Sequence, residues 1–272
     1  MVSVMASTGE TQPPPNVDTT VPHSARIWNY WLGGTDNFAV DRAAGDQFRQ
    51  TFPGIDELAR VSRQFLGRTV RYLVGEAGIR QFLDVGSGLP TVDNTHEIAQ
   101  RIAPESRIVY VDHDPLVLAH ARALLVGSAE GATDYVDADL REPAEVLDAA
   151  ARTLDFSRPI GLILSGVLGH IADTGQARAT VARLVAGLPP ASYVSINDGT
   201  RVHGGDAVEQ AQQDYNESGA APYNLRSVDE ITSFFAGLEL VEPGIVPCPW
   251  WRPDPGAEPA DSDAVGGVGR KP

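Results

Sequence analysis

Short apolar runs alternate with amphipathic stretches through the middle of the chain. Five apolar runs predict strands, at residues 81–85, 107–111, 133–136, 160–164 and 191–196, and two late runs at 238–241 and 245–246 predict two more. Stretches with helical spacing lie between or after them, at 95–102, 115–125, 143–151, 176–186, 206–218 and 227–236. Apolar strands separated by helices are typical of a parallel sheet covered on both faces. The sequence therefore predicts an α/β, Rossmann-like fold with a mostly parallel seven-stranded sheet and helices on both faces.

The chain is expected to form one domain with extensions at both ends. Residues 21–252 hold the predicted sheet, and residues 21–75 are helical in character and predict a cap over one edge of that sheet. Residues 1–20 are polar and include three consecutive prolines, which predicts a disordered leader. Residues 253–272 mix proline, glycine, aspartate and alanine without periodicity, which predicts a flexible tail.

Acidic residues outnumber basic ones, at 36 against 21, and give a net charge of −15. A surface this acidic disfavours nucleic acid and anionic membranes as partners, because both require neutralising cations. Cys248 is the only cysteine and the six histidines are scattered, so neither an internal disulfide nor a metal site is expected. The apolar runs are too short to cross a bilayer and no secretory signal is visible, which favours a cytoplasmic protein with a small-molecule substrate. Composition leaves the oligomeric state open.

A glycine-containing turn follows the first predicted strand. Asp84 lies near the end of that strand, and Gly86, Ser87 and Gly88 follow it. Glycines at alternate positions let the backbone turn sharply and let a ligand approach the main chain. A dinucleotide-binding turn would place a third glycine where Thr91 stands, which disfavours a pyrophosphate site. An acid ahead of the glycines suits a ligand with a cationic amino-acid end; the alternative is a plain strand–turn–helix junction.

Acidic residues also follow the second and third predicted strands. Asp112, with His113 beside it, comes where a carboxylate can accept two hydrogen bonds from the vicinal hydroxyls of a ribose. Asp139 can accept from an adenine amine while the N–H of Leu140 donates to the ring, and Asp137 is the alternative acid. Because the carboxyl ends of parallel strands meet at one edge, these residues and the glycine turn predict a site for an adenosine-containing ligand.

The loop after the fourth predicted strand runs from Ser165 to His170. A small residue such as Ser165 leaves room for the reactive part of a ligand. His170 is a candidate general base, because an unperturbed histidine titrates near neutrality. The alternative is that His170 only packs or caps at the start of a helix. After the fifth strand, Asp198 and His203 are further candidates for contact with a substrate.

Three parts of the chain together resemble one known protein family. They are residues 23–38 (HSARIWNYWLGGTDNF) with the following Asp41 and Arg42, residues 82–91 (FLDVGSGLPT), and the late segments FFAGL, EPG and WRP at 234–238, 242–244 and 251–253. The family is the S-adenosyl methyltransferase family of high-GC bacteria, first known only as a domain of unknown function, and the resemblance covers roughly residues 20–253. It implies a class I methyltransferase fold and S-adenosylmethionine as the cofactor. Thr35 stands where the family often has lysine, a position read as tolerant.

The resemblance also implies that the segment from residue 23 to residue 38 belongs to the cofactor site. Arg26 and Asn37 offer polar contacts, Gly34 offers a flexible turn, and Tyr30 offers an aromatic face that would attract a sulfonium cation. The alternative, favoured for the neighbouring tryptophans, is that the aromatic side chains only hold a helix to the core.

The sequence therefore favours a methyltransferase that acts on a small molecule by in-line displacement, in which positioning and the exclusion of water supply most of the acceleration. A non-catalytic module that binds S-adenosylmethionine or S-adenosylhomocysteine is the alternative, because no obligatory catalytic residue marks this class of enzyme. A nicotinamide-dependent oxidoreductase is disfavoured by Thr91 and by the lack of a Tyr-x-x-x-Lys pair.

Overall fold

The structure is a computed structural model that describes residues 17–91, 93–118 and 127–272. Within these residues eight strands form one sheet: β1 (Gln81–Val85), β2 (Arg107–Asp112), β3 (Ala132–Asp137), β4 (Gly161–Ser165), β5 (Tyr193–Gly199), β6 (Glu239–Leu240), β7 (Val246–Pro247) and β8 (Ala264–Arg270). The strand order is β3-β2-β1-β4-β5-β8-β6, with β7 also paired to β8. The first five strands run parallel, and β8 runs antiparallel to its three neighbours.

Helices connect these strands and precede the first of them. The helices that lie wholly within the described residues are α1 (Ser24–Trp31), α2 (Ala39–Thr51), α3 (Ile55–Gly75), α4 (Thr95–Ile102), α6 (Pro143–Ala150), α7 (Thr174–Gly187), α8 (Gly205–Glu217) and α9 (Val228–Ser233), with short 3-10 helices η1 (Leu168–His170) and η2 (Cys248–Trp250). Residues 115–118 are helical, and the remainder of the helix expected at 115–125 lies outside the described residues. None of the described helices combines the length and the apolarity that a bilayer span requires.

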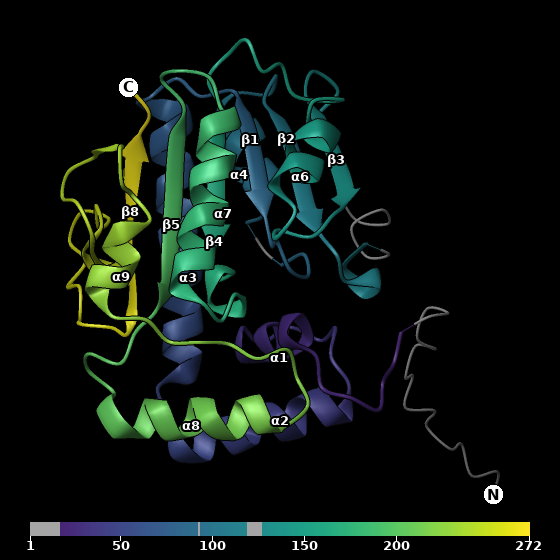
Figure 1. Ribbon diagram of the computed structural model, residues 1–272, viewed down its shortest axis with the longest axis vertical. Helices are drawn as coiled ribbons and strands as arrows, with labels where there is room; N and C mark the ends of the chain where they lie inside the picture. Colours follow the sequence, from purple (N-terminus) through teal and green to yellow (C-terminus); the bar gives the residue numbers. More distant parts are fainter. Residues whose placement is uncertain (1–16, 92, 119–126) are drawn as a thin grey trace, which may run out of the picture.

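Helices cover both faces of the sheet, α6, α7 and α9 over one and α3 and α4 over the other (Figure 1). Successive residues of β1 divide between the two layers, because side chains of a strand point alternately to opposite faces. Phe82 packs with Phe65 and Ile98 from α3 and α4, whereas Leu83 packs on the side of Val146 and Val181 from α6 and α7. This arrangement confirms the predicted α/β fold with a mostly parallel sheet between helical layers.

The predicted elements before residue 200 are found close to their expected bounds. β1 and α4 begin and end at the residues predicted for them, and β2 to β5 each overlap the apolar run predicted as a strand. The sheet holds eight strands where seven were predicted. The extra strand lies in the segment predicted to be a flexible tail.

The prediction of a flexible tail over residues 253–272 is wrong for β8, which pairs along its full length with β5 and fills the sheet between β5 and β6. Its sequence, AVGGVGR, resembles a loop because glycine weakens a strand. Here the glycines permit close packing. A Cβ added at Gly266 would lie 2.6 Å from the carbonyl oxygen of Ile196, and one at Gly269 would lie 2.9 Å from the side chain of Leu238.

A helical cap lies beyond the ends to which β1, β2 and β3 point (Figure 1). It consists of α1, α2, α8 and the first turns of α3, and α8 lies along α2. Its core is aromatic, since the ring of Trp31 lies 5.1 Å from that of Phe48 and 6.3 Å from that of Tyr215. Residues 21–75 are therefore largely helical, as predicted, and α8 joins them from a distant part of the sequence. Residues 1–16 of the predicted leader lie outside the described residues.

Candidate functional site

A cavity of about 380 Å³ lies between the cap and the carboxyl ends of β1, β2, β4 and β5. Ten of the residues predicted from the sequence as site residues line it: Asp84, Gly86, Ser87, Gly88, Asp112, His113, Asp139, Leu140, Ser165 and His170. Cavities of this size are typical of small-molecule sites, and the edge formed by strand carboxyl ends is where α/β folds bind ligands.

The turn after β1 holds its shape through two glycines with left-handed backbone. Gly86 has a φ of 74°, and its N–H donates to the carbonyl of Val111 over 2.8 Å. A Cβ at this position would lie 2.2 Å from Val167. Gly88 has a φ of 64°, and its N–H donates to Oδ2 of Asp112 over 2.9 Å. A Cβ at Gly88 would meet nothing within 4 Å, so this part of the turn borders open space in which a ligand can reach the main chain.

Asp84 is buried at the inner end of this turn, with 5% of its surface exposed. Burial raises the pKa of its carboxyl group to about 6, against the opposing effects of a 2.6 Å hydrogen bond from Oγ1 of Thr95 and of the nearby Arg63 charge. A buried carboxylate of this kind gains from a cationic ligand, because the ligand's charge offsets the cost of desolvation.

Asp112 ties the second strand to the glycine turn. Its Oδ1 accepts from the N–H groups of His113 and Asp114 over 2.8 and 3.0 Å, and its Oδ2 accepts from Gly88. Since each carboxylate oxygen has two lone pairs, Oδ2 retains one for a further donor such as a ribose hydroxyl. Asp112 is therefore both a part of the turn and a candidate ligand contact.

Asp139 forms an ion pair with Arg141 at the far end of the cavity. The Nε atom of Arg141 lies 3.0 Å from each carboxylate oxygen, and Nη2 lies 2.5 Å from Oδ2. These hydrogen bonds lower the pKa of Asp139 and keep it ionised. Arg141 also lines the cavity, as does the buried Leu140. The acid expected near an adenine amine is thus accompanied by a cation that the sequence analysis did not single out.

His170 is positioned by the segment that follows α8. Its Nδ1 lies 2.9 Å from the carbonyl oxygen of Pro222, which can only accept, so Nδ1 carries the proton and Nε2 is the free acceptor. Its ring lies edge-to-face with that of Tyr223, at 5.2 Å. Burial lowers the pKa of His170, so the ring is neutral at pH 7. His170 can therefore pack against its neighbours and still act as a general base, because the packed ring keeps an unprotonated nitrogen.

Asp198 at the end of β5 belongs to a second buried polar group. It accepts hydrogen bonds from the hydroxyl of Tyr223 and, over 3.3 Å, from Nη1 of Arg226. Burial raises its pKa to about 6. Asp198 and Tyr223 both line the cavity, which agrees with the expectation for Asp198. His203 is exposed and outside the lining, and its N–H donates to Asp263.

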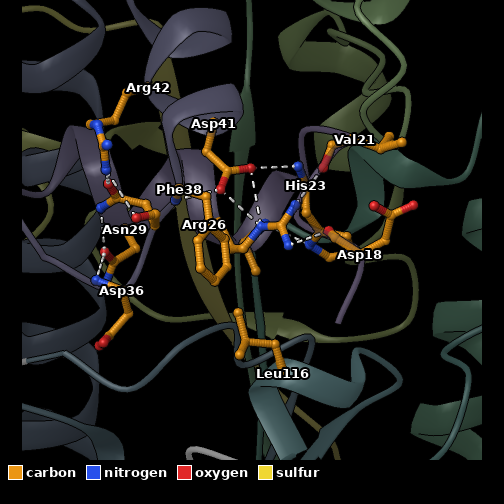
Figure 2. A network of polar contacts seen from close by, with 12 residues as sticks. Asp18, Val21, His23, Arg26, Asn29, Asp36, Phe38, Asp41, Arg42 and Leu116 are labelled. Carbon is orange, nitrogen blue, oxygen red and sulfur yellow. Dashed lines mark hydrogen bonds and ion pairs between the residues drawn. The ribbon is translucent and has the colours of Figure 1, made fainter. Parts of the chain in front are cut away.

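Four residues expected to contact a cofactor through the family resemblance do not line the cavity: Arg26, Tyr30, Gly34 and Asn37. Figure 2 shows why for Arg26, which is buried and faces the carboxylate of Asp41 on one side and the carbonyls of Asp18 and Val21 on the other. Its Nε lies 3.0 Å from Asp41, so the guanidinium holds together the segments on either side of it. This side chain has a structural task in place of the predicted ligand contact.

Tyr30, Gly34 and Asn37 likewise contact other residues of the cap. The side-chain amide of Asn37 donates to Oδ1 of Asn29 over 3.0 Å, and a Cβ at Gly34 would lie 2.4 Å from the same asparagine. The hydroxyl of Tyr30 donates to Asp46 on α2. The sequence shows which side chains are polar, but it does not show that their partners lie within the cap.

The cap nevertheless contributes to the cavity through other residues. From α1 and its flanks come His23, Ser24, Ala25, Trp28, Asn29, Trp31 and Leu32. Nδ1 of His23 lies 2.9 Å from Oδ2 of Asp114, which links α1 to the helical residues after β2. Arg63, Gln212 and Tyr215 of α3 and α8 also line the cavity. Helical spacing could reveal which face of these helices is apolar, but not that this face meets the sheet edge.

Comparison with known proteins gives a consistent result. A family model described as S-adenosyl methyltransferase matches residues 10–272. The crystal structure of a DUF574 family protein from Streptomyces avermitilis has 43% sequence identity and a TM-score of 0.89, and covers 94% of this chain and 99% of that chain. The crystal structure of a proposed methyltransferase from Thermobifida fusca has 40% identity and a TM-score of 0.87, and covers 95% of this chain and 98% of that one. A search of curated proteins found no match.

Proposed function

Because the chain belongs to the S-adenosyl methyltransferase family and is a methyltransferase with S-adenosylmethionine as its cofactor, we propose that it methylates a small molecule held in the cavity under the cap. The observation that supports this most is the convergence of the glycine turn, the strand-end acids and His170 on one enclosed cavity. The cavity has room for a small molecule beside the cap.

The residues at the sheet edge fit the cofactor. The open side of Gly88 lets the ligand lie close to the main chain, the free lone pair of Asp112 suits a ribose hydroxyl, and buried Asp84 suits the ammonium group. When bound, S-adenosylmethionine supplies a methyl group on a positively charged sulfur, which the lone pair of an acceptor displaces in line. Asp139 and Leu140 would hold the adenine, and Ser165 would border the reactive end.

His170 would take the proton of the acceptor. Its Nε2 is unprotonated because Nδ1 donates to Pro222, and the fixed ring orientation removes the need to reorganise during reaction. The cap would exclude water from the cavity and hold the acceptor in line with the bond to be broken. Positioning of this kind supplies much of the rate acceleration, because a direct displacement needs no covalent intermediate with the protein.

The proposed function is tested by metabolite profiling with an isotopically labelled methyl donor. The purified protein, a bacterial metabolite extract and labelled S-adenosylmethionine should yield at least one labelled small molecule, together with S-adenosylhomocysteine. Labelled protein or nucleic acid in place of a small molecule would contradict the proposal. A calorimetric titration with S-adenosylhomocysteine checks cofactor binding independently of the acceptor.

Replacement of His170 tests the proposed base. The variant His170→Ala should reduce turnover by about a hundredfold or more, while the affinity for S-adenosylhomocysteine stays within about twofold of the original. The matched control is His203→Ala, which removes an exposed histidine outside the cavity and should leave both quantities unchanged. An equal loss of turnover and of cofactor affinity in His170→Ala would assign His170 a structural task only.

A further inference from the structure

The two sides of the cavity differ sharply in character. The side formed by the cap carries an apolar surface of which half the residues are aromatic, and we call it the cap wall: Trp28, Trp31, Leu32, Phe48, Ile55, Leu58, Val208 and Tyr215. The cap also contributes the uncharged polar residues Ser24, Asn29 and Gln212 to the lining. Among the described residues, none that α1, α2 or α8 contributes to the cavity lining carries a charge, and the charge that α3 contributes, that of Arg63, lies near Asp84 at the sheet edge. The opposite side, at the sheet edge, carries the acids that fit the cofactor.

The four aromatic rings of the cap wall contact one another. Trp28 packs edge-to-face on Trp31 with ring centres 5.9 Å apart, and Phe48 and Tyr215 pack against each other at 6.2 Å. Such a surface favours a flat apolar ligand, because aromatic rings gain from offset and edge-to-face contact beyond the burial of area. A charged ligand group buried there would lose its hydration without gaining a counter-ion.

Tyr223 marks the boundary between the two sides. It packs against the aromatic core of the cap, and its ring also contacts His170 at 5.2 Å. Nη1 of Arg226 forms an ion pair with Asp198 nearby, and the hydroxyl of Tyr223 donates a hydrogen bond to it, so this acid offers no unpaired charge to a cationic acceptor. At this boundary, Nε2 of His170 can accept the proton of a hydroxyl group on the molecule to be methylated.

We propose that the methyl acceptor is an uncharged aromatic molecule with a ring hydroxyl, whose ring lies against the cap wall and whose hydroxyl meets His170. This inference rests on the proposed function and narrows its acceptor. A phenol suits a neutral histidine base better than an aliphatic alcohol does, because phenols ionise near pH 10, whereas aliphatic alcohols are far weaker acids.

The proposed reaction balances with His170 as the only protein group that takes part in proton transfer. The hydroxyl proton moves to Nε2 of His170, the phenolic oxygen forms a bond to the methyl carbon, and the electron pair of the broken carbon–sulfur bond stays on sulfur. The products are an aryl methyl ether and S-adenosylhomocysteine, and His170 returns its proton to water after release. No oxidant, reductant or metal is required.

A charge series of probes tests the inference by calorimetry in the presence of saturating S-adenosylhomocysteine. The probes are 2-naphthol, a naphthol that carries a carboxylate on the second ring, and one that carries an aminomethyl group there. We expect 2-naphthol to bind at least about tenfold more tightly than either charged counterpart. Equal or tighter binding of a charged probe, or no binding of 2-naphthol, would overturn the inference.

A pair of tryptophan variants tests the location. Trp28→Ala should weaken 2-naphthol binding by about tenfold or more and leave the affinity for S-adenosylhomocysteine within about twofold. The matched control is Trp250→Ala, since Trp250 is 46% exposed and outside the cavity lining, and it should change neither affinity. An equal effect of the two substitutions on 2-naphthol would overturn the assignment to the cap wall.

The same measurements separate the two proposals. If S-adenosylhomocysteine does not bind the unaltered protein, the proposed function fails, and the inference fails with it. If S-adenosylhomocysteine binds and labelled methyl groups reach a charged or non-aromatic small molecule, the proposed function stands and only the inference on the acceptor fails.

Discussion

Gly86 and Gly88 show how a missing Cβ shapes the cavity. Both have a φ that L side chains rarely adopt, but only Gly86 lies against another side chain, at 2.2 Å from Val167 for an added Cβ. Gly86 therefore serves close packing between the turn after β1 and the loop after β4. Gly88 serves the open approach to the main chain.

The two glycines should respond differently to the same substitution. Gly88→Ala adds only backbone strain and should lower the free energy of unfolding by about 1 kcal/mol. Gly86→Ala adds the clash with Val167 and should lower it by about 2–4 kcal/mol. Urea unfolding of both variants measures the difference. Equal losses of unfolding free energy would mean that the loop after β4 can shift to relieve the clash and that Val167 does not fix the turn.

Sequence reasoning at this scale succeeded where neighbouring elements determine the position. Asp84, Asp112 and Asp139 follow consecutive parallel strands, so strand order alone brings them to one edge, and all three line one cavity. Their individual contacts with a cofactor remain predictions. The reasoning failed for Arg26, because nothing in the sequence pairs it with Asp41 fifteen positions away rather than with a ligand.

Among the described strands, β8 is the one that sequence reasoning missed, and it was missed for a physical reason. Strand propensity rewards side chains that pack on a pleated surface, and three of its seven residues are glycine. The need for glycine arises from neighbours that only the folded sheet supplies, such as the carbonyl of Ile196. By contrast, β1 and α4 carry their own signals, a short run rich in apolar residues and a capping box from Asn94 to Glu97.

A charge placed in β8 should therefore be far more harmful than the same charge in the loop before it. Val268 is fully buried and pairs with Ser195, whereas Ala260 is exposed. Val268→Asp should lower the free energy of unfolding by about 3–5 kcal/mol, or prevent folding, because it buries an unpaired carboxylate. Ala260→Asp should change it by no more than about 0.5 kcal/mol. Thermal unfolding followed by circular dichroism compares them, and a tolerated Val268→Asp would show that β8 is dispensable.

For the molecule as a whole, two buried acids oppose the stability of the fold. Burial raises the pKa of Asp84 and of Asp198 to about 6, well above the ordinary value of an aspartate carboxyl. Well below pH 4 both carboxyl groups are protonated in the folded and in the unfolded state, so they do not lower the free energy of unfolding. Between pH 4 and pH 6 the two carboxyl groups lose their protons in the unfolded chain but keep them in the folded protein. The free energy of unfolding therefore falls as the pH rises, and above pH 6 it stays low.

The pH dependence of unfolding isolates this contribution. Asp84→Asn removes one ionisation, so its stability relative to the unaltered protein should improve between pH 4 and pH 7, by roughly 3 kcal/mol at most, since one pKa unit corresponds to about 1.4 kcal/mol. Urea unfolding at several pH values in this range, without cofactor, measures the difference. A constant difference across the range would mean that Asp84 ionises as readily in the folded protein as in the unfolded chain.

The cavity is enclosed by stretches of chain that lie far apart in sequence, because α1 and α2 precede the sheet and α8 falls between β5 and β8. A ligand bound in the cavity contacts all of these stretches and so stabilises the folded state as a whole. Mass action then adds about 2.7 kcal/mol to the free energy of unfolding when the free ligand stands at a hundred times its dissociation constant. In a growing cell the lifetime of the protein would accordingly follow the supply of methyl donor, and starvation for that donor would expose the enzyme to proteases.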